Sequence, residues 1–316
     1  MKIILVIGGL IMIDSNTLYS LILANKDKCN TGKVADYIPG LKNANKENFG
    51  ICIMDNNNKI SYAGDYEKKF TIQSISKPLI LMLAILDNEE DYIFSKIGME
   101  PTGDPFNSIK KLETSFSKPF NPMINAGAIA VSSMIKGDSS EEKFNRVLDF
   151  IKKISENPNL DYDRDIYHGE KITGNRNRSM AYFMKNDGII EGDVEEALDI
   201  YFKQCSILIT AFDLAKIGLF LANNGVTSSG ERVVSIHTAK LVKSLMVTCG
   251  MYDGSGEFAV KVGIPAKSGV GGGILSLVPG KMGIGVYGPA LDLKGNSIGG
   301  YALLEDISNL LSLSIF

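Results

Sequence analysis

The stretch Phe70-Thr-Ile-Gln-Ser-Ile-Ser-Lys-Pro-Leu79 places Ser74 three residues ahead of Lys77, directly before a long apolar segment that predicts a buried helix. On a helix, residues three apart share one face with Cβ atoms about 5–6 Å apart, so the hydroxyl and the amine can share a proton. The helix dipole favours negative charge near an N-terminal serine, and Pro78 is tolerated in the first turn. The pattern predicts a serine nucleophile with a lysine base. Ser-x-x-Lys is also common as a helix-start serine beside a solvated lysine.

A second lysine, Lys267, begins the segment Lys267-Ser-Gly-Val-Gly-Gly-Gly273, on or beside a predicted strand. A lysine with its reference pKa of about 10.4 is a poor base, so Lys77 needs burial or a second cation, for which Lys267 is the candidate. Lys-Ser-Gly resembles the strand motif that accompanies Ser-x-x-Lys in serine β-lactamases and penicillin-binding proteins. The glycines allow a ligand to approach the backbone closely, and the N–H groups of Val270 and Ser74 would form an oxyanion hole. A plain glycine-rich turn is the alternative.

Strand patterns occur at both ends of the chain, with helical patterns between them. Strands are predicted at 49–54, 59–63, 258–262, 273–278 and 282–287, and helices at 17–24, 143–154, 180–185, 194–206, 213–223 and 305–313. We therefore expect an α+β fold whose antiparallel sheet is built from both chain ends and flanked by helices, with an inserted all-α part. The expected organisation is a sheet part, 15–75 plus 251–316, and a helical part, 76–250, with the functional cleft between them.

Residues 1–14 form a leader of uncertain status. The segment from Met1 to Ile13 carries one charge and resembles the front half of a signal peptide. The resemblance is incomplete, because Asp14-Ser-Asn follows in place of a small-residue cleavage site, and a membrane-spanning helix needs about 18 apolar residues. A translation start near Met12 is the alternative, and we expect a cytoplasmic protein without a membrane partner.

Composition excludes several classes of function. The 316 residues are 45% hydrophobic and 22% charged, with a net charge of −3 and no cluster of lysines with aromatic residues, which argues against a nucleic-acid partner. The cysteines lie far apart and contain no Cys-x-x-Cys pair, so we expect neither a zinc site nor a disulfide framework. These cysteines are Cys29, Cys52, Cys205 and Cys249.

Two further motifs lack the context that their function needs. Gly283-Ile-Gly-Val-Tyr-Gly288 matches the dinucleotide fingerprint, but Pro289 follows at once and the glycines lie inside a predicted strand. A Ser-His-Asp triad would need His168 or His237, but His237 lies at the start of a predicted helix and a lysine base requires neither histidine.

Polar residues are dense in three segments of the helical middle: 121–127, 170–178 and 201–206. Asparagine and glutamate in such segments suit recognition of an amino acid, whose ammonium group needs a carboxylate and whose carboxylate needs N–H or O–H donors. Taken singly, each is also typical of a loop cap or turn former.

Together these segments resemble the bacterial-type serine-dependent glutaminase family, which has a β-lactamase-like fold. The matching stretches appear in family order over about Gly32 to Gly300. They are Gly32-Lys-Val-Ala-Asp-Tyr-Ile-Pro39, Gln73-Ser-Ile-Ser-Lys77, Glu100-Pro-Thr-Gly-Asp-Pro-Phe-Asn-Ser108, Asn121-Pro-Met-Ile-Asn-Ala-Gly127, Thr173-Gly-Asn-Arg-Asn-Arg178, Gln204-Cys-Ser206, Gly250-Met-Tyr-Asp-Gly-Ser-Gly-Glu-Phe258 and Pro265-Ala-Lys-Ser-Gly-Val-Gly-Gly-Gly273.

The resemblance implies hydrolysis of L-glutamine to L-glutamate and ammonia through a glutamyl ester on Ser74, with Lys77 as the proton-transfer partner. It implies no metal or organic cofactor, and a homodimer or homotetramer. The substrate-binding positions that carry over are Ser74, Asn125, Glu170, Asn177, Tyr201, Tyr252 and Val270. Glu170 is expected to face the substrate ammonium, one of the two tyrosines to protonate the leaving amine, and Lys267 to lower the pKa of Lys77 and hold the tyrosine hydroxyls.

Two alternatives stay open. The Ser-x-x-Lys and Lys-Ser-Gly pair alone would also permit a β-lactamase or a D-Ala-D-Ala peptidase. A catalytically silent amino-acid sensor on the same fold is the other alternative, although both Ser74 and Lys77 are present.

Overall fold

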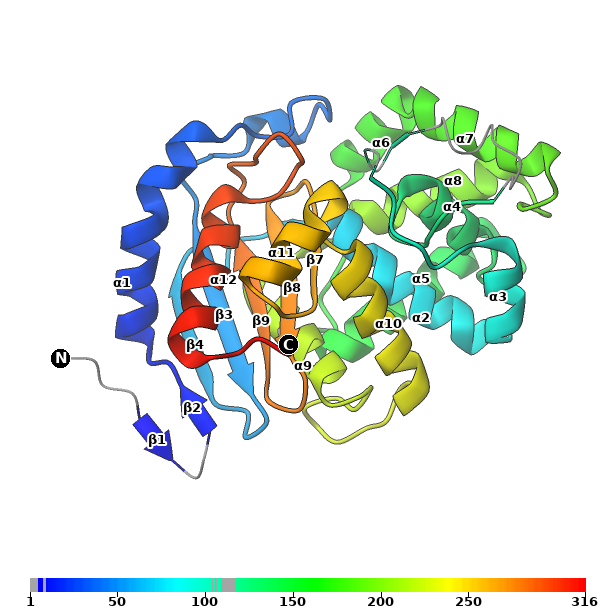
Figure 1. Cartoon of the computed structure of the whole chain (residues 1–316). Helices are drawn as coiled ribbons and strands as arrows, with labels where there is room; N and C mark the ends of the chain where they lie inside the picture. Colours follow the sequence, from blue (N-terminus) through cyan, green and yellow to red (C-terminus); the bar gives the residue numbers. More distant parts are fainter. Residues whose placement is uncertain (1–4, 8–9, 104, 106, 109–117) are drawn as a thin grey trace.

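Five antiparallel strands form the central sheet, in the order β4-β3-β9-β8-β7. They belong to a computed structural model of the chain, which describes residues 5–7, 10–103, 105, 107–108 and 118–316. The strands are β3 (Gly50–Asp55), β4 (Ile60–Gly64), β7 (Ala266–Ser268), β8 (Gly273–Val278) and β9 (Met282–Tyr287). The pairing of β3 with β9, with Ile51 opposite Val286, joins the two ends of the chain. The sheet is thus antiparallel and built from both termini, as expected (Figure 1).

The β3–β4 hairpin forms where the sequence predicts it. Asp55 Oδ1 accepts hydrogen bonds from the backbone N–H groups of Asn57 at 2.8 Å and Lys59 at 2.9 Å. Asn58 adopts a φ of 59°, the left-handed conformation that asparagine tolerates better than most residues. The side chain of Asp55 therefore stabilises the turn and sets the register of the two strands.

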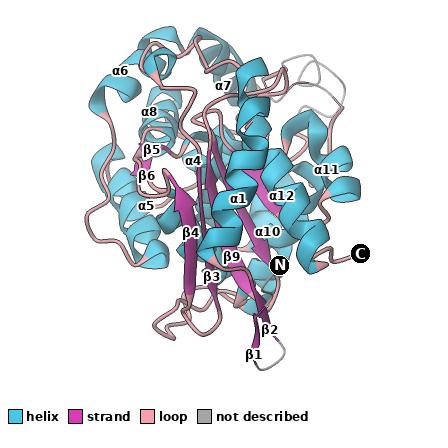
Figure 2. Cartoon of the chain, turned by 90° about the vertical axis from the view of Figure 1, so that its left-hand side faces the viewer, coloured by secondary structure: helices cyan, strands magenta, loops and turns pink. Residues whose placement is uncertain are grey.

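Helices cover both faces of the sheet. Helices α1 and α12 lie against one face, where Leu18 and Ile22 share a buried core with Leu303 and Ile307 (Figure 2), and α9 lies against the other. The helices are α1 (Ser15–Lys26), α2 (Ser76–Asp87), α3 (Glu90–Lys96), α4 (Asn125–Ser133), α5 (Ser140–Ser155), α6 (Arg164–Thr173), α7 (Asn175–Asn186), α8 (Val194–Cys205), α9 (Ala211–Ala222), α10 (Ile236–Cys249), α11 (Ser255–Lys261) and α12 (Ile298–Leu311). Within the described residues, none of them has the length and apolar character needed to cross a membrane.

The glycines of the rejected dinucleotide fingerprint serve the packing of α9. A Cβ atom on Gly285 would lie 2.0 Å from Ala211 O, and one on Gly283 would lie 2.0 Å from Leu219 N. Both glycines belong to strand β9, so the motif does not open a helix as nucleotide binding requires. Its function is to let a helix approach the sheet closely.

One predicted strand is wrong. Residues 258–262 belong to helix α11 (Ser255–Lys261) and its C-cap, Val262. The β-branched residues favoured a strand, but Phe258 and Val262 lie four apart and are buried in the same core, whereas Val260 is 87% exposed. That spacing suits one face of a helix, and tertiary packing overrides the local strand propensity.

The helical part packs around α2, whose residues from Ser76 to Ala84 are all buried. A short two-stranded sheet ties the start of this region together, with β5 (Phe70–Thr71) paired to β6 (Leu208–Ile209). Ile72 N also donates to Ile207 O at 2.8 Å. The backbone leading into Ser74 is therefore held in place by its hydrogen bonds to residues 207–209. Two further strands, β1 (Leu5–Ile7) and β2 (Leu10–Met12), form a separate hairpin.

An ion pair between the partly exposed Arg146 and the buried Asp87 joins the end of α2 to α5. Arg146 contacts both carboxylate oxygens of Asp87, whose side chain is only 5% exposed, and Asp87 also accepts from Lys136 N at 2.9 Å.

Arg146→Met is expected to lower the free energy of unfolding by about 2 kcal/mol, because it leaves a buried carboxylate without its cation. Denaturant unfolding tests this, with Lys153→Met as the control on the same helix. Glu231, the partner of Lys153, is exposed, so Lys153→Met should lower the free energy of unfolding by less than about 0.5 kcal/mol. Equal losses of stability in the two variants would contradict the account.

Candidate active site

Ser74 lies in a single 3₁₀ turn, Gln73–Ile75, that leads directly into α2. Its side chain is buried, and Lys77 follows three residues later in the first turn of the helix. Gln73 has a φ of 49°, a left-handed conformation that is uncommon outside glycine. A strained residue directly before the candidate nucleophile is a pattern found at functional sites.

Lys77 is almost completely buried, at 1% exposure. Its Nζ donates to Asn125 Oδ1 at 2.7 Å and to Met123 O at 3.2 Å. Burial lowers the pKa of Lys77 to about 8, a shift that the negative charge of Glu170 opposes. A lysine with such a pKa is present in part as the neutral amine near neutral pH, which is the form that can accept a proton.

Asn125 begins helix α4 and links Lys77 to the next helical segment. Its Nδ2 donates to Asn177 Oδ1 at 3.1 Å, while its Oδ1 accepts from Lys77. Since a protonated lysine can only donate, this pairing fixes which side of the Asn125 amide faces the lysine. The bond from Asn125 Nδ2 in turn orients the side-chain amide of Asn177 on α7.

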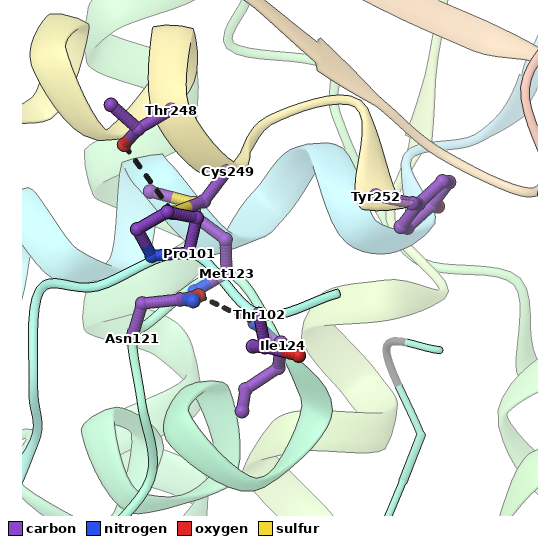
Figure 3. Close-up of a pocket in the computed structure, with 8 residues that line it drawn as sticks. All are labelled: Pro101, Thr102, Asn121, Met123, Ile124, Thr248, Cys249 and Tyr252. Carbon is purple, nitrogen blue, oxygen red and sulfur yellow. Dashed lines mark hydrogen bonds between the residues drawn. The ribbon is translucent and has the colours of Figure 1, made fainter. Parts of the chain in front are cut away.

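Figure 3 shows how the loop before α4 is held. Asn121 lies beside Met123 and Ile124 (Figure 3), and its Oδ1 accepts from Met123 N at 2.9 Å and Ile124 N at 3.2 Å. Its Nδ2 donates to the backbone oxygen of Glu100, which the figure does not draw, at 2.8 Å. These bonds form the wall of a small pocket of about 20 Å³, large enough for one water molecule. The same bonds fix the peptide of Met123, whose carbonyl accepts from Lys77.

Glu170 comes from α6 and is 8% exposed. Its Oε1 accepts a hydrogen bond from Gln73 Nε2 at 2.9 Å. Burial raises the pKa of Glu170 to about 7, while the Gln73 hydrogen bond and the charge of Lys77 act in the opposite direction. A buried carboxylate at this position favours the binding of a cationic group, which would compensate its desolvation.

Tyr252 and Lys267 form a second pair of buried groups. Burial raises the pKa of the Tyr252 hydroxyl, against the effect of its hydrogen bond with Ser74. Lys267 Nζ lies 4.4 Å from the centre of the Tyr252 ring and donates to Ser268 O at 2.6 Å and Gly250 O at 3.0 Å. Lys267 thus contacts the face of the aromatic ring, a cation–π arrangement, and burial together with the charge of Lys77 lowers its pKa.

Val270 lies in the glycine-rich turn that follows β7, not on the strand itself. A Cβ atom on Gly271 would lie 2.3 Å from Thr71 O, and one on Gly269 would lie 2.8 Å from Ile72 O. The two glycines therefore allow this turn to pass directly against the backbone that leads into Ser74.

A cavity of about 280 Å³ opens at Ser74. Six of the residues predicted from sequence line it: Ser74, Asn125, Glu170, Asn177, Tyr201 and Val270. The remaining three lie outside the lining: Lys77 donates to Asn125, Tyr252 is hydrogen-bonded to Ser74, and Lys267 contacts the Tyr252 ring. Tyr201, on α8, is 3% exposed, and burial raises the pKa of its hydroxyl.

The cavity also contains residues that the sequence analysis did not single out. Tyr37, Gln73 and Arg176 lie on its wall. All three belong to stretches quoted for the family resemblance, and the position of Gln73 beside Ser74 was the available signal. Both histidines lie elsewhere: His237 is bonded to Glu90 at 2.8 Å on the surface, and His168 is exposed on α6.

Within the part of the chain that the structure describes, no group of three or more His, Cys, Asp or Glu side chains is arranged to hold a metal ion. The cavity instead joins a hydroxyl, a buried amine, a buried carboxylate and amide groups. This set is suited to acyl transfer on a small polar substrate.

Comparison with known proteins identifies relatives along almost the whole chain. A model of the Glutaminase family matches residues 32–316. A glutaminase of Fusobacterium nucleatum is 63% identical over 300 residues, which cover 95% of this chain and 99% of the relative. A glutaminase of Clostridioides difficile is 57% identical over 306 residues, covering 96% and 99%.

A solved structure gives the same result. The covalent complex of Bacillus subtilis glutaminase with 5-oxo-L-norleucine, formed by reaction with 6-diazo-5-oxo-L-norleucine, has a TM-score of 0.88 to this chain at 37% identity. The match covers 96% of this chain and 99% of that one. The mixed fold of antiparallel sheet and helices is therefore that of the bacterial glutaminases.

Proposed function

Because this chain belongs to the glutaminase family, we propose that it hydrolyses L-glutamine to L-glutamate and ammonia through a glutamyl ester on Ser74. The observation that carries the mechanism is the position of Ser74, whose hydroxyl lies at a 280 Å³ cavity one helical turn from the buried amine of Lys77. A serine next to a lysine of lowered pKa is an activated nucleophile.

In the first half of the reaction, neutral Lys77 takes the Ser74 proton and Oγ attacks the carbon of the substrate side-chain amide. The backbone N–H groups of Ser74 and Val270 bind the resulting oxyanion. The C–N bond then breaks, and ammonia leaves with a proton delivered from Lys77 through the hydroxyl of Tyr252, which is hydrogen-bonded to Ser74. In the second half, water attacks the ester, Lys77 takes its proton, and glutamate leaves as Ser74 regains its own.

The cavity wall supplies the groups that recognise an amino acid. Glu170 faces the α-ammonium group, and the amides of Asn125 and Asn177 with the hydroxyl of Tyr201 make the remaining polar contacts. Lys267 orients Tyr252 through the face of its ring, whereas burial is the main cause of the lowered pKa of Lys77. No metal or organic cofactor takes part in this scheme.

Three broader inferences accompany the proposal. The relation of the fold to serine β-lactamases and penicillin-binding proteins rests on Ser74-x-x-Lys77 with Lys267-Ser-Gly. The division into a sheet part (15–75 plus 251–316) and a helical part (76–250) rests on the strand patterns at both chain ends and the helical patterns between them. A cytoplasmic location agrees with four buried, unpaired cysteines. The homodimer or homotetramer that the family resemblance implies is testable by light scattering on the purified protein.

Ammonia and glutamate release from L-glutamine by the purified protein tests the proposed activity. Equimolar release of the two products is expected, together with no opening of a chromogenic cephalosporin. Cephalosporin opening without glutamine hydrolysis would indicate the β-lactamase alternative. Binding of glutamine without release of ammonia would indicate a sensor.

The two shifted pKa values predict how activity depends on pH. Glu170, with a pKa of about 7, must be ionised to bind an ammonium group, and Lys77, with a pKa of about 8, must be neutral to accept a proton. Both requirements are met as pH rises, so kcat/KM is expected to climb by about tenfold per unit between pH 7 and 8 and more steeply below. Steady-state rates between pH 5.5 and 8.5 measure this, and a flat or falling profile would contradict it.

A further inference from the structure

Gln73 makes two side-chain hydrogen bonds on the wall of the cavity. Its Nε2 donates to Glu170 Oε1 at 2.9 Å and to Thr71 Oγ1 at 3.2 Å. The side chain is buried, with 3% of Gln73 exposed, and Thr71 is buried as well, at 1%. The amide NH₂ has two hydrogens, and these two acceptors use both of them.

The two bonds fix the orientation of the Gln73 amide. A carboxylate can only accept, so the NH₂ group must face Glu170. The Thr71 hydroxyl holds the amide from the other side, on strand β5, whose pairing with β6 is part of the rigid scaffold. The amide oxygen then remains as an acceptor in the same region as the Glu170 carboxylate.

From this geometry we propose that Gln73 is a positioning and specificity residue, which with Thr71 orients Glu170 and keeps it ionised for the α-ammonium group of the substrate. This role rests on the proposed glutaminase activity and extends it. The substrate amino group would be recognised by Glu170, which Gln73 orients through one hydrogen bond while Thr71 orients Gln73 through another. The left-handed φ of 49° at Gln73 fits this role. It directs the side chain to Glu170 while the next residue presents the nucleophile.

Other titratable groups also act on Glu170 and must be considered in the test. They are Lys77 from α2, Tyr201 and Cys205 from α8, and Tyr37 from the loop that precedes β3, with Arg176 of α7 on the same cavity wall. Of these, Lys77 favours the ionised form of Glu170. A change at Gln73 leaves all of them in place, so its effect reports the loss of the hydrogen bond.

The test compares L-glutamine with glutaramate, which has the same side-chain amide and carboxylate but no amino group. Gln73→Met keeps the length of the side chain and removes both donors. We expect kcat/KM for L-glutamine to fall at least about 30-fold, whereas that for glutaramate changes less than about threefold. We also expect the acid limb of the L-glutamine pH profile to move upward by at least about one unit, since the carboxylate loses a donor to its charged form.

Two further variants keep the test decisive. Thr71→Val removes only the acceptor that orients the Gln73 amide, so a smaller shift in the same direction is expected even if Gln73→Met folds poorly. Gln204→Met makes the same substitution at another buried glutamine, whose side chain is bonded to Ser132 outside the cavity lining. This variant should leave the ratio of kcat/KM for L-glutamine to kcat/KM for glutaramate unchanged.

Equal losses on both substrates in Gln73→Met and Thr71→Val, with an unmoved pH profile, would overturn the proposal and assign Gln73 a structural role. Failure of the proposed function would look different. In that case the wild-type protein itself would release no ammonia from L-glutamine.

Discussion

Ser74→Ala is expected to lower kcat for L-glutamine by at least about 10⁴-fold, because the variant lacks the oxygen on which the proposed ester forms. Serine hydrolases lose this much when the nucleophile is removed, and the residual rate comes from binding and the oxyanion hole. Substrate binding should persist, since Glu170, Asn125 and Asn177 are unchanged. Ammonia release measures kcat, and calorimetric titration measures binding to the inactive variant.

A matched serine provides the control. Ser155, on α5, is as well buried as Ser74 and bonds only to carbonyls of its own helix. Ser155→Ala should retain activity within about threefold, so that loss of a buried hydroxyl alone does not explain the effect. Undiminished ammonia release by Ser74→Ala would end the serine mechanism.

Lys77→Met is expected to lower kcat by at least about 10³-fold without lowering the stability of the fold at pH 7. The folded-state pKa of Lys77, about 8, lies below its value of about 10.5 in the unfolded chain. The buried charge of Lys77 therefore lowers the free energy of unfolding. This loss is full below pH 8 and vanishes as pH rises toward 10.5. Removal of the charge should raise the free energy of unfolding at pH 7 by about 1–2 kcal/mol, after allowing for the lost bonds to Met123 and Asn125.

Two measurements distinguish a role of Lys77 in proton transfer from a role as a fixed positive charge. Denaturant unfolding at pH 7 and at pH 10 should show the gain in Lys77→Met shrinking at the higher pH. Lys77→Arg keeps a positive charge that cannot be lost and should be as inactive as Lys77→Met. An active arginine variant, or strong destabilisation of the methionine variant at pH 7, would show that Lys77 acts as a structural cation.

Much of the fold follows from local sequence patterns. The Asp55–Asn58 turn predicts the β3–β4 hairpin because the side chain of Asp55 bonds its own loop. The predicted helix at 194–206 corresponds to α8, and the predicted strands at 273–278 and 282–287 correspond to β8 and β9, which are buried along their whole length. The error at 258–262 has a physical cause, since five residues rich in β-branched side chains do not distinguish a strand from a short helix.

The site is less accessible to local reasoning. Ser74 and Lys77 are close because they lie three apart on one turn, so their proximity is predictable. The approach of Asn125, Asn177 and Glu170 to them depends on how α4, α6 and α7 pack. The polar segments 121–127 and 170–178 were indicated by their composition, and the family resemblance singled out the three residues within them. The left-handed backbone of Gln73 and Tyr252, with φ of 49° and 56°, leaves no local signal in the sequence.

The most direct test of the central claim is to locate the covalent adduct. The Bacillus subtilis relative forms a covalent complex on reaction with 6-diazo-5-oxo-L-norleucine. The same reagent, followed by proteolysis and tandem mass spectrometry, should inactivate this protein and place one 5-oxo-norleucine group on Ser74, with no labelling of Ser74→Ala. An adduct on another residue such as Cys205, or persistent activity without any adduct on Ser74, would contradict the account.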